Sequence, residues 1–204
     1  MALFGASWAK EKDDLYEVAK DAGFQIAKVG LTVINGGYQG TMEASAIGAK
    51  EAGGECIGVL VPSVFRHRPF AGNEHLSSYV VKGSILERIN HMVEQADAFL
   101  VLPGTVGTLT ELCVAWNVAA LAPMGKYSAP KIYCFRDPWE KTLSGMAECL
   151  GVSDAIMGAI TYVDSAEEAM ELLKEDRTTR QERLVAAGIG KGSFVDPVPA
   201  RKTT

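Results

Sequence analysis

The residues best suited to chemistry in this sequence are a glutamate, an arginine and two glycine-rich segments. Glu111 stands just after the segment Pro103-Gly-Thr-Val-Gly-Thr108, and Arg88 lies upstream of it. A carboxylate can act as a base or stabilise developing positive charge, and a guanidinium group can hold phosphate or carboxylate through two parallel hydrogen bonds. Glycines allow backbone amides to come close to an anion. These residue types predict a site for a phosphorylated ligand.

The stronger glycine segment leaves an expected strand at 97–102 and opens an expected helix at 108–121. A helix N-terminus offers free amides and positive potential to an anion. The segment contains no lysine, so it is not the loop that binds a triphosphate with magnesium. We therefore predict phosphate binding by Gly104, Thr105, Val106, Gly107 and Thr108.

The weaker glycine segment, Asn35-Gly-Gly-Tyr-Gln-Gly-Thr41, leaves an expected strand at 31–35 and enters a helix at 40–53. It approaches the dinucleotide fingerprint, but Asn35 stands at the first glycine and no acid ends the next strand, so a nicotinamide cofactor is not expected. Two interpretations stay open: a phosphate site or a tight strand–helix turn. The phosphate-site interpretation uses Gly36, Gly37, Gly40 and Thr41, with the hydroxyl of Ser7 after the first strand.

Both candidate catalytic side chains also have a purely structural interpretation. Thr108 and Glu111 have the spacing of a capping box, in which Glu111 binds the backbone of Thr108. The rest of that helix is apolar nearly all round, so it should be buried, and a lone carboxylate there is costly. Arg88 lies at the border of the apolar stripe of helix 84–96, where it either reaches into a cleft or covers the core with its stem.

The elements that must position these residues alternate between short apolar runs and longer amphipathic ones. We expect strands at 2–6, 31–35, 55–61, 78–81, 97–102, 130–135 and 160–163, and helices at 11–28, 40–53, 84–96, 108–121, 138–149 and 165–174. Nearly continuous apolar strands are typical of parallel sheets covered on both faces, and such sheets bind ligands outside the carboxyl ends of their strands. Arg66-His67-Arg68, which follows the third strand, is either a gate or solvated charge.

These elements predict an α/β fold, a single-domain Rossmann-like three-layer sandwich with a mostly parallel sheet of about seven strands. The domain is expected over residues 1–175. Residues 176–204 are rich in charged and small residues, which predicts a C-terminal helix and tail that is partly flexible.

Composition limits the partners. The net charge of -5 argues against nucleic acid, and no apolar run approaches the roughly 20 residues that cross a membrane. The chain starts on an apolar strand without the pattern of a signal peptide. The four cysteines form no CxxC pair, which favours reduced core thiols, a cytoplasmic location and no metal site.

Taken together, the motifs resemble the Lonely Guy (LOG) family, often labelled "lysine decarboxylase-like". The family's turn after the first strand corresponds to Gly5-Ala6-Ser7, its GGGxxGLMG turn to Asn35–Met42, its Arg-Lys helix to Arg88-Ile89, and its PGGxGTxxE motif to Pro103–Glu111. The segment Gln95–Leu102 also resembles the family. The similarity covers roughly residues 1–175 in order, which is far more specific than any single motif.

The resemblance implies a nucleoside 5′-monophosphate phosphoribohydrolase, which releases a free base, often a cytokinin, from its ribosyl 5′-monophosphate. It implies Glu111 and Arg88 as the catalytic pair, the two loops as phosphate binders, no cofactor, and a homodimer with sites near the interface. No pyridoxal-binding lysine is identifiable, so decarboxylation is not expected. Thr105, Ile89 and Asn35 depart from the family pattern, and they motivate the alternative of a non-catalytic nucleotide-binding or sensing protein of the same superfamily.

Overall fold

The computed structural model describes residues 1–122 and 129–186, with Thr178–Ala186 as backbone only. The chain divides into two compact units, Met1–Met170 and Glu171–Thr204. The sheet and all candidate site residues belong to the first unit. The predicted tail falls largely on residues 187–204, which lie outside the described residues, and the predicted boundary near residue 175 stays a prediction.

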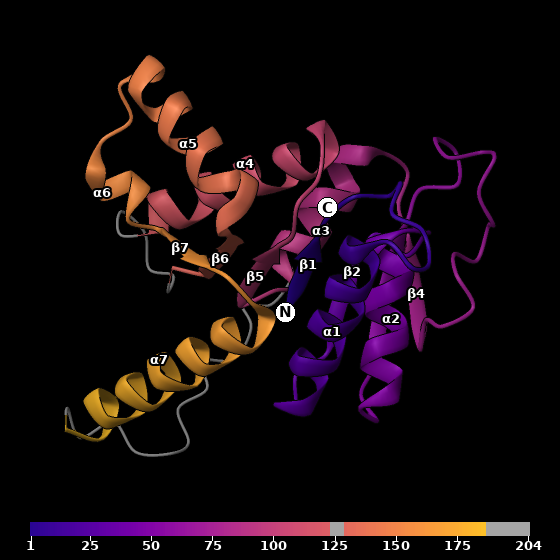
Figure 1. The fold of residues 1–204 in the computed structure, drawn as a ribbon, viewed down its shortest axis with the longest axis horizontal. Coiled ribbons are helices and arrows are strands. Elements are labelled where there is room, and N and C mark those ends of the chain that lie inside the picture. Colours follow the sequence, from indigo (N-terminus) through magenta and orange to yellow (C-terminus); the bar gives the residue numbers. More distant parts are fainter. Residues whose placement is uncertain (123–128, 187–204) are drawn as a thin grey trace, which may run out of the picture. The chain divides into compact units, whose positions relative to one another are not determined.

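The centre of the first unit is a parallel sheet (Figure 1). In the described part of the chain it has seven strands: β1 Ala2–Phe4, β2 Val33–Asn35, β3 Cys56–Leu60, β4 Ser78–Val81, β5 Ala98–Val101, β6 Lys131–Phe135 and β7 Ile160–Val163. Their order across the sheet is β4-β3-β2-β1-β5-β6-β7, and every neighbouring pair is parallel. The predicted α/β Rossmann-like fold is confirmed.

Helices cover both faces of this sheet. The helices are α1 Asp14–Lys28, α2 Thr41–Glu51, α3 Ile85–Glu94, α4 Val106–Leu121, α5 Arg136–Leu150, α6 Asp154–Met157 and α7 Ala166–Ala186. Helices α1 and α2 pack together on one face, and α3, α4 and α5 lie on the other (Figure 1). One core cluster joins the second group to the sheet through side chains such as Ile89, Leu112 and Trp139. The sandwich therefore has three layers.

Four helices differ from the sequence-based expectation, and the first of them, α1, begins at Asp14 rather than at residue 11. Helix α4 begins at Val106 rather than at residue 108, because Thr105 and not Thr108 is its N-cap. Helix α6 was not expected, since four residues are too few to show a hydrophobic period. Helix α7 continues to Ala186 instead of ending near residue 174, and the sequence of its added turns is rich in Glu, Arg and Gln, which have high helix propensity.

The strand order reverses direction at β1, which defines where a ligand is expected. From β1 the chain builds outward through β2, β3 and β4, and then returns to β5 on the other side of β1. In such sheets the loops that leave the two strands at the reversal point diverge and open a crevice at their carboxyl ends. The loops after β1, β2 and β5 hold Ser7, Asn35–Thr41 and Pro103–Thr105 respectively, so the fold gathers the predicted site residues at one edge.

The cysteines are free, as expected, but they do not all lie in the core. Cys56 and Cys134 are buried, and burial raises the pKa of the Cys56 thiol to about 12. Cys149 is exposed near the end of α5, so the expectation of a core position is wrong for this residue. Cys149 lies on the exposed side of the amphipathic helix α5. The expectation of a core position relied on the apolar residue next to it in the sequence.

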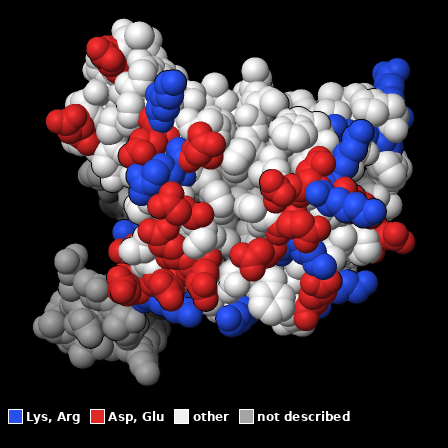
Figure 2. All heavy atoms as spheres, viewed as in Figure 1, with Lys and Arg blue, Asp and Glu red and all other residues white. Residues whose placement is uncertain are grey.

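Two further observations concern the surface. On the face shown in Figure 2, acidic and basic side chains are mixed over α1 and α2. Within the described residues, no helix is both long and apolar enough to cross a membrane.

Candidate active site

The centre of the candidate site is a buried ion pair between α3 and α4. Arg88 Nη1 donates to Glu111 Oε1 at 3.0 Å, and the two residues are only 7% and 8% exposed. Charged side chains are almost never this buried unless they are paired. The structure thus brings together the two residues that the sequence marked as a catalytic pair.

Arg88 is held by more than Glu111. Its Nε donates to the carbonyl oxygen of Val59 at 2.8 Å, and its Nη2 lies 3.8 Å from the sulfur of Met42. Each nitrogen of the guanidinium group therefore already contacts the protein. A side chain at position 36 would collide with Nη2 of Arg88, so Gly36 leaves the space that this guanidinium group fills.

The start of α3 fixes the position of Arg88 along the helix. Ser84 is the N-cap, and its hydroxyl accepts from the Glu87 amide at 3.2 Å, while the Glu87 carboxylate accepts from the Gly83 amide at 3.0 Å. This reciprocal cap satisfies amides that the helix leaves free. The neighbouring Ile89, which stands where the family has lysine, is buried in the core.

Glu111 is not part of a capping box. Because α4 begins at Val106, Thr108 lies inside the helix, and the Glu111 carboxylate faces Arg88 instead. The capping-box interpretation is therefore wrong. Burial raises the pKa of the Glu111 carboxyl above its ordinary value, and the positive charge of Arg88 opposes this rise only in part.

The N-terminus of α4 has the features of an anion site. Its N-cap, Thr105, is extended and makes no side-chain capping hydrogen bond, so the side chain leaves the first amides of the helix uncapped. Gly107 faces open space, whereas Gly104 is pressed against the side chain of Thr108. Val106 is exposed and Thr108 is buried. Phosphate binding at Gly104–Thr108 stays a prediction.

The loop after β2 is organised by the buried Asn35. Its amide nitrogen donates to the Met42 carbonyl at 2.9 Å and to Ser45 Oγ at 3.0 Å, and its Oδ1 accepts from the Gly37 amide at 2.7 Å. Asn35 therefore supplies hydrogen bonds that a glycine cannot, which explains this departure from the family pattern. Gly37 and Gly40 both have positive φ, at 74° and 75°, which favours glycine at these positions.

The same loop is tied to the loop after β1. The amide and the hydroxyl of Thr41 both donate to the Ala6 carbonyl, at 3.0 and 3.1 Å. Gly40 lies so close to the backbone of Ser7 that a side chain at position 40 would collide with it. These contacts place Ser7, Gly40 and Thr41 together. Phosphate binding by these residues, and by Gly36 and Gly37, stays a prediction.

Sequence reasoning missed an aromatic cluster beside the ion pair. The Tyr38 and Phe65 rings meet edge to face at 5.2 Å, and the partly buried Phe65 packs against a buried apolar cluster of Tyr38, Met42 and Leu60. The guanidinium group of Arg68 lies 4.7 Å from the centre of the Phe65 ring. The only sequence signal was that Arg66-His67-Arg68 follows a strand at the correct edge of the sheet.

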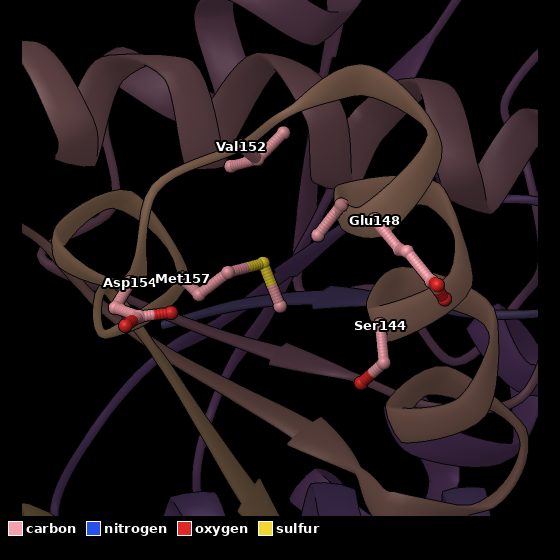
Figure 3. A pocket seen from close by; sticks show the side chains of 6 residues that line it. Ser144, Glu148, Val152, Asp154 and Met157 are labelled. Atoms are coloured by element: carbon pink, nitrogen blue, oxygen red, sulfur yellow. The ribbon is translucent and has the colours of Figure 1, made fainter.

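A separate surface pocket lies between α5 and α6 (Figure 3). It is lined by Ser144, Ala147, Glu148, Val152, Asp154 and Met157. None of these was a predicted site residue, and the pocket shares no residue with the ion pair or the glycine loops.

The parallel sheet, the two glycine loops and the buried arginine–glutamate pair agree with the family assignment. Residues 1–128 match the model of the SLOG cluster4 family, and the chain belongs to this family. The resemblance to LOG proteins that the motifs indicated is confirmed by curated relatives. A cytokinin riboside 5′-monophosphate phosphoribohydrolase of Mycobacterium tuberculosis is 33% identical over 164 residues, or 77% of this chain and 84% of that protein.

Other similar proteins broaden the comparison. A cytokinin riboside 5′-monophosphate phosphoribohydrolase of Rhodococcoides fascians is 29% identical, covering 70% of this chain and 71% of its own length. Among solved structures, the molybdenum cofactor binding protein of Rippkaea orientalis matches with a TM-score of 0.64 at 23% identity, covering 85% of this chain and 93% of that one. The molybdenum cofactor carrier protein of Chlamydomonas reinhardtii matches with a TM-score of 0.60 at 22% identity, over 85% and 95%. At this identity the structures are evidence for the fold alone.

Proposed function

We propose that this chain hydrolyses the N-glycosidic bond of a nucleoside 5′-monophosphate and releases the free base and ribose 5-phosphate. The observation that carries the proposal is the buried Arg88–Glu111 pair, in which Glu111 belongs to α4, the helix whose N-terminus has no side-chain cap. The names of the relatives support it, and they favour a cytokinin riboside 5′-monophosphate as substrate.

Glu111 is the catalytic residue in this proposal. As the bond between C1′ and the base breaks, positive charge develops on the ribose ring. A carboxylate close to that ring stabilises this charge or accepts a proton from the attacking water. The water oxygen bonds to C1′, and the departing base receives a proton. Burial strengthens the electrostatic effect, because little water screens the carboxylate.

Arg88 fixes the Glu111 carboxylate in this proposal. Its bonds to Val59 and Glu111 restrict both side chains to one geometry, which lowers the reorganisation needed during the reaction. The phosphate group is assigned to the amides of Gly104–Thr108, assisted by the loop Gly36–Thr41 and by Ser7. Binding energy from this remote group would position C1′ near Glu111.

The test is an incubation of the purified protein with a panel of nucleoside 5′-monophosphates, cytokinin ribosides included, followed by chromatography. We expect free base and ribose 5-phosphate in equal amounts. The corresponding nucleosides, which lack phosphate, are the matched control substrates and should react far more slowly. Monophosphates that bind but remain intact after long incubation would contradict the proposal and favour a non-catalytic nucleotide-binding protein.

We also propose a cytoplasmic homodimer formed through the outer faces of α3 and α4. The expectation that α4 is buried nearly all round is wrong within one chain, since Val118 and Leu121 on its outer face are 44% and 52% exposed. Leu86 on α3 and Val106 on α4 are exposed even more, and the two helices pack against each other. A second copy would cover these apolar side chains.

A further inference from the structure

Arg68 lies on the same aromatic ring as Arg88, and we propose that its guanidinium group binds the phosphate group of the substrate. This inference rests on the proposed function, because it assigns a residue to that substrate. It concerns a residue outside the glycine loops and the Arg88–Glu111 pair.

Two aromatic rings hold the Arg68 guanidinium group in place. Its central carbon, Cζ, lies 5.1 Å from the centre of the Tyr38 ring and 4.7 Å from that of Phe65. Tyr38 is itself fixed, because its hydroxyl accepts from the Val61 amide at 2.9 Å. A cation near aromatic faces is attracted by their electrons, so Arg68 is positioned before any ligand arrives. A preorganised group loses less entropy on binding.

The same rings connect Arg68 to the candidate active site. The Cζ atom of Arg88 lies 6.0 Å from the centre of the Phe65 ring, so both guanidinium groups border one side chain. Tyr38 belongs to the loop after β2, between Gly37 and Gly40. Arg68 therefore lies beside the loop to which phosphate contacts were assigned, and on the same apolar cluster as Met42, which contacts Arg88.

The charges around these two arginines are unbalanced. Glu111 is engaged by Arg88, while among the described residues no ion pair includes Arg68. In this described part of the chain, Arg68 Nε is also buried without a hydrogen-bond partner. Burial and the charge of Arg88 lower the pKa of Arg68, which means that its surroundings disfavour the charged form.

An anion bound to Arg68 would balance this positive charge, and phosphate is the anion whose oxygens suit the donors of an arginine. A buried donor without an acceptor is unfavourable, and an arginine side chain offers a planar set of donors suited to phosphate oxygens. Each nitrogen of Arg88 already contacts the protein, whereas Arg68 Nε has no hydrogen-bond partner among the described residues, so Arg68 is the better placed of the two to receive phosphate. The division of roles follows: Arg88 positions Glu111, and Arg68 binds phosphate.

The experiment measures binding of ribose 5-phosphate by calorimetry to the full chain and to Arg68→Gln, Arg68→Lys and Arg66→Gln. Arg66 is the matched control, since it lies on the same loop, is exposed, and donates to Ser63. We expect Arg68→Gln to weaken binding about tenfold or more, because a charge-assisted contact is lost. Arg68→Lys should retain part of the affinity, and Arg66→Gln should bind like the wild type. For turnover of a monophosphate, Arg68→Gln should raise KM by a larger factor than it lowers kcat.

The possible outcomes separate this inference from the proposed function. Unchanged affinity for ribose 5-phosphate in a folded Arg68→Gln protein overturns the inference, and so does an equal loss in Arg66→Gln. A wild-type protein that binds ribose 5-phosphate through Arg68 but releases no base overturns the proposed function and leaves the inference standing. A wild-type protein that does neither overturns both.

Discussion

At the scale of single residues, the arrangement depends on a Glu111 side chain that is largely removed from solvent. Desolvation of a buried carboxylate is unfavourable, and the attraction of one arginine compensates for it only in part. Such a pair contributes little to stability compared with a well-packed apolar pair. Its presence between α3 and α4 is better explained by chemistry than by folding.

We predict that Glu111→Gln removes activity and preserves the fold. The glutamine carbonyl can still accept from Arg88, but it cannot stabilise a positive ribose ring or take a proton. Turnover should fall about 10²-fold or more. The melting temperature should fall as well, because the substitution leaves Arg88 buried without a counter-charge, but the protein should still unfold cooperatively from a folded state. The measurement combines base release with a thermal melt. Glu94→Gln, an exposed position on α3, is the control with the same change of charge, and wild-type turnover in Glu111→Gln would refute the assignment.

A second prediction concerns pH. Because burial raises the pKa of Glu111 and the proposed reaction needs the ionised carboxylate, kcat/KM should fall as the pH is lowered through this raised pKa. The decline should begin at a higher pH than an ordinary glutamate would cause. A profile of kcat/KM against pH locates it. The residual activity of Glu111→Gln should lack this decline, and its persistence there would assign it to another group.

At the scale of elements, the site depends on how closely the loop after β2 approaches α3. We predict that Gly36→Ala lowers kcat/KM about tenfold or more, since the new methyl group would push against Arg88 Nη2 and displacement near 1 Å is enough for such losses. Stability should fall by about 1–3 kcal/mol through overpacking. Steady-state kinetics and urea unfolding measure both effects.

Gly145→Ala is the matched control for that variant. Gly145 lies inside α5 and faces open space, so alanine there should keep activity and raise the free energy of unfolding by about 0.5–1 kcal/mol. Equal activity in Gly36→Ala and Gly145→Ala would show that Arg88 does not need its observed position.

Sequence patterns predicted the elements better than the contacts between them. The strands are nearly continuous apolar runs, and glycine or polar residues mark their ends, so all seven were placed within about two residues. The start of α4 was misplaced because Thr105 and Thr108 are equally plausible caps in sequence. The packing of Arg68 on Tyr38 and Phe65 was not predictable, because it joins two loops whose approach depends on the whole sheet.

At the scale of the whole molecule, the exposed apolar residues of α4 lead to a prediction about assembly. Val118→Asp should convert a dimer into a monomer at micromolar concentration, because two copies of the new charge would be buried at the interface. Sedimentation velocity distinguishes the two states. Leu150→Asp on α5, another exposed apolar residue, is the control and should not change the assembly. A wild-type protein that sediments as a monomer would contradict the dimer directly.

The parallel arrangement of the sheet also has a consequence for how the chain folds. No two neighbouring strands are joined by a hairpin, and the central pair brings Ala2 next to Phe99, so its formation requires closure of a very long loop. Topologies dominated by such distant contacts fold slowly. During synthesis, β1 cannot pair with β5 until β5 has left the ribosome. Until then, the edge of β1 that faces β5 is free to pair with other strands. The crevice between them is therefore among the last features to form.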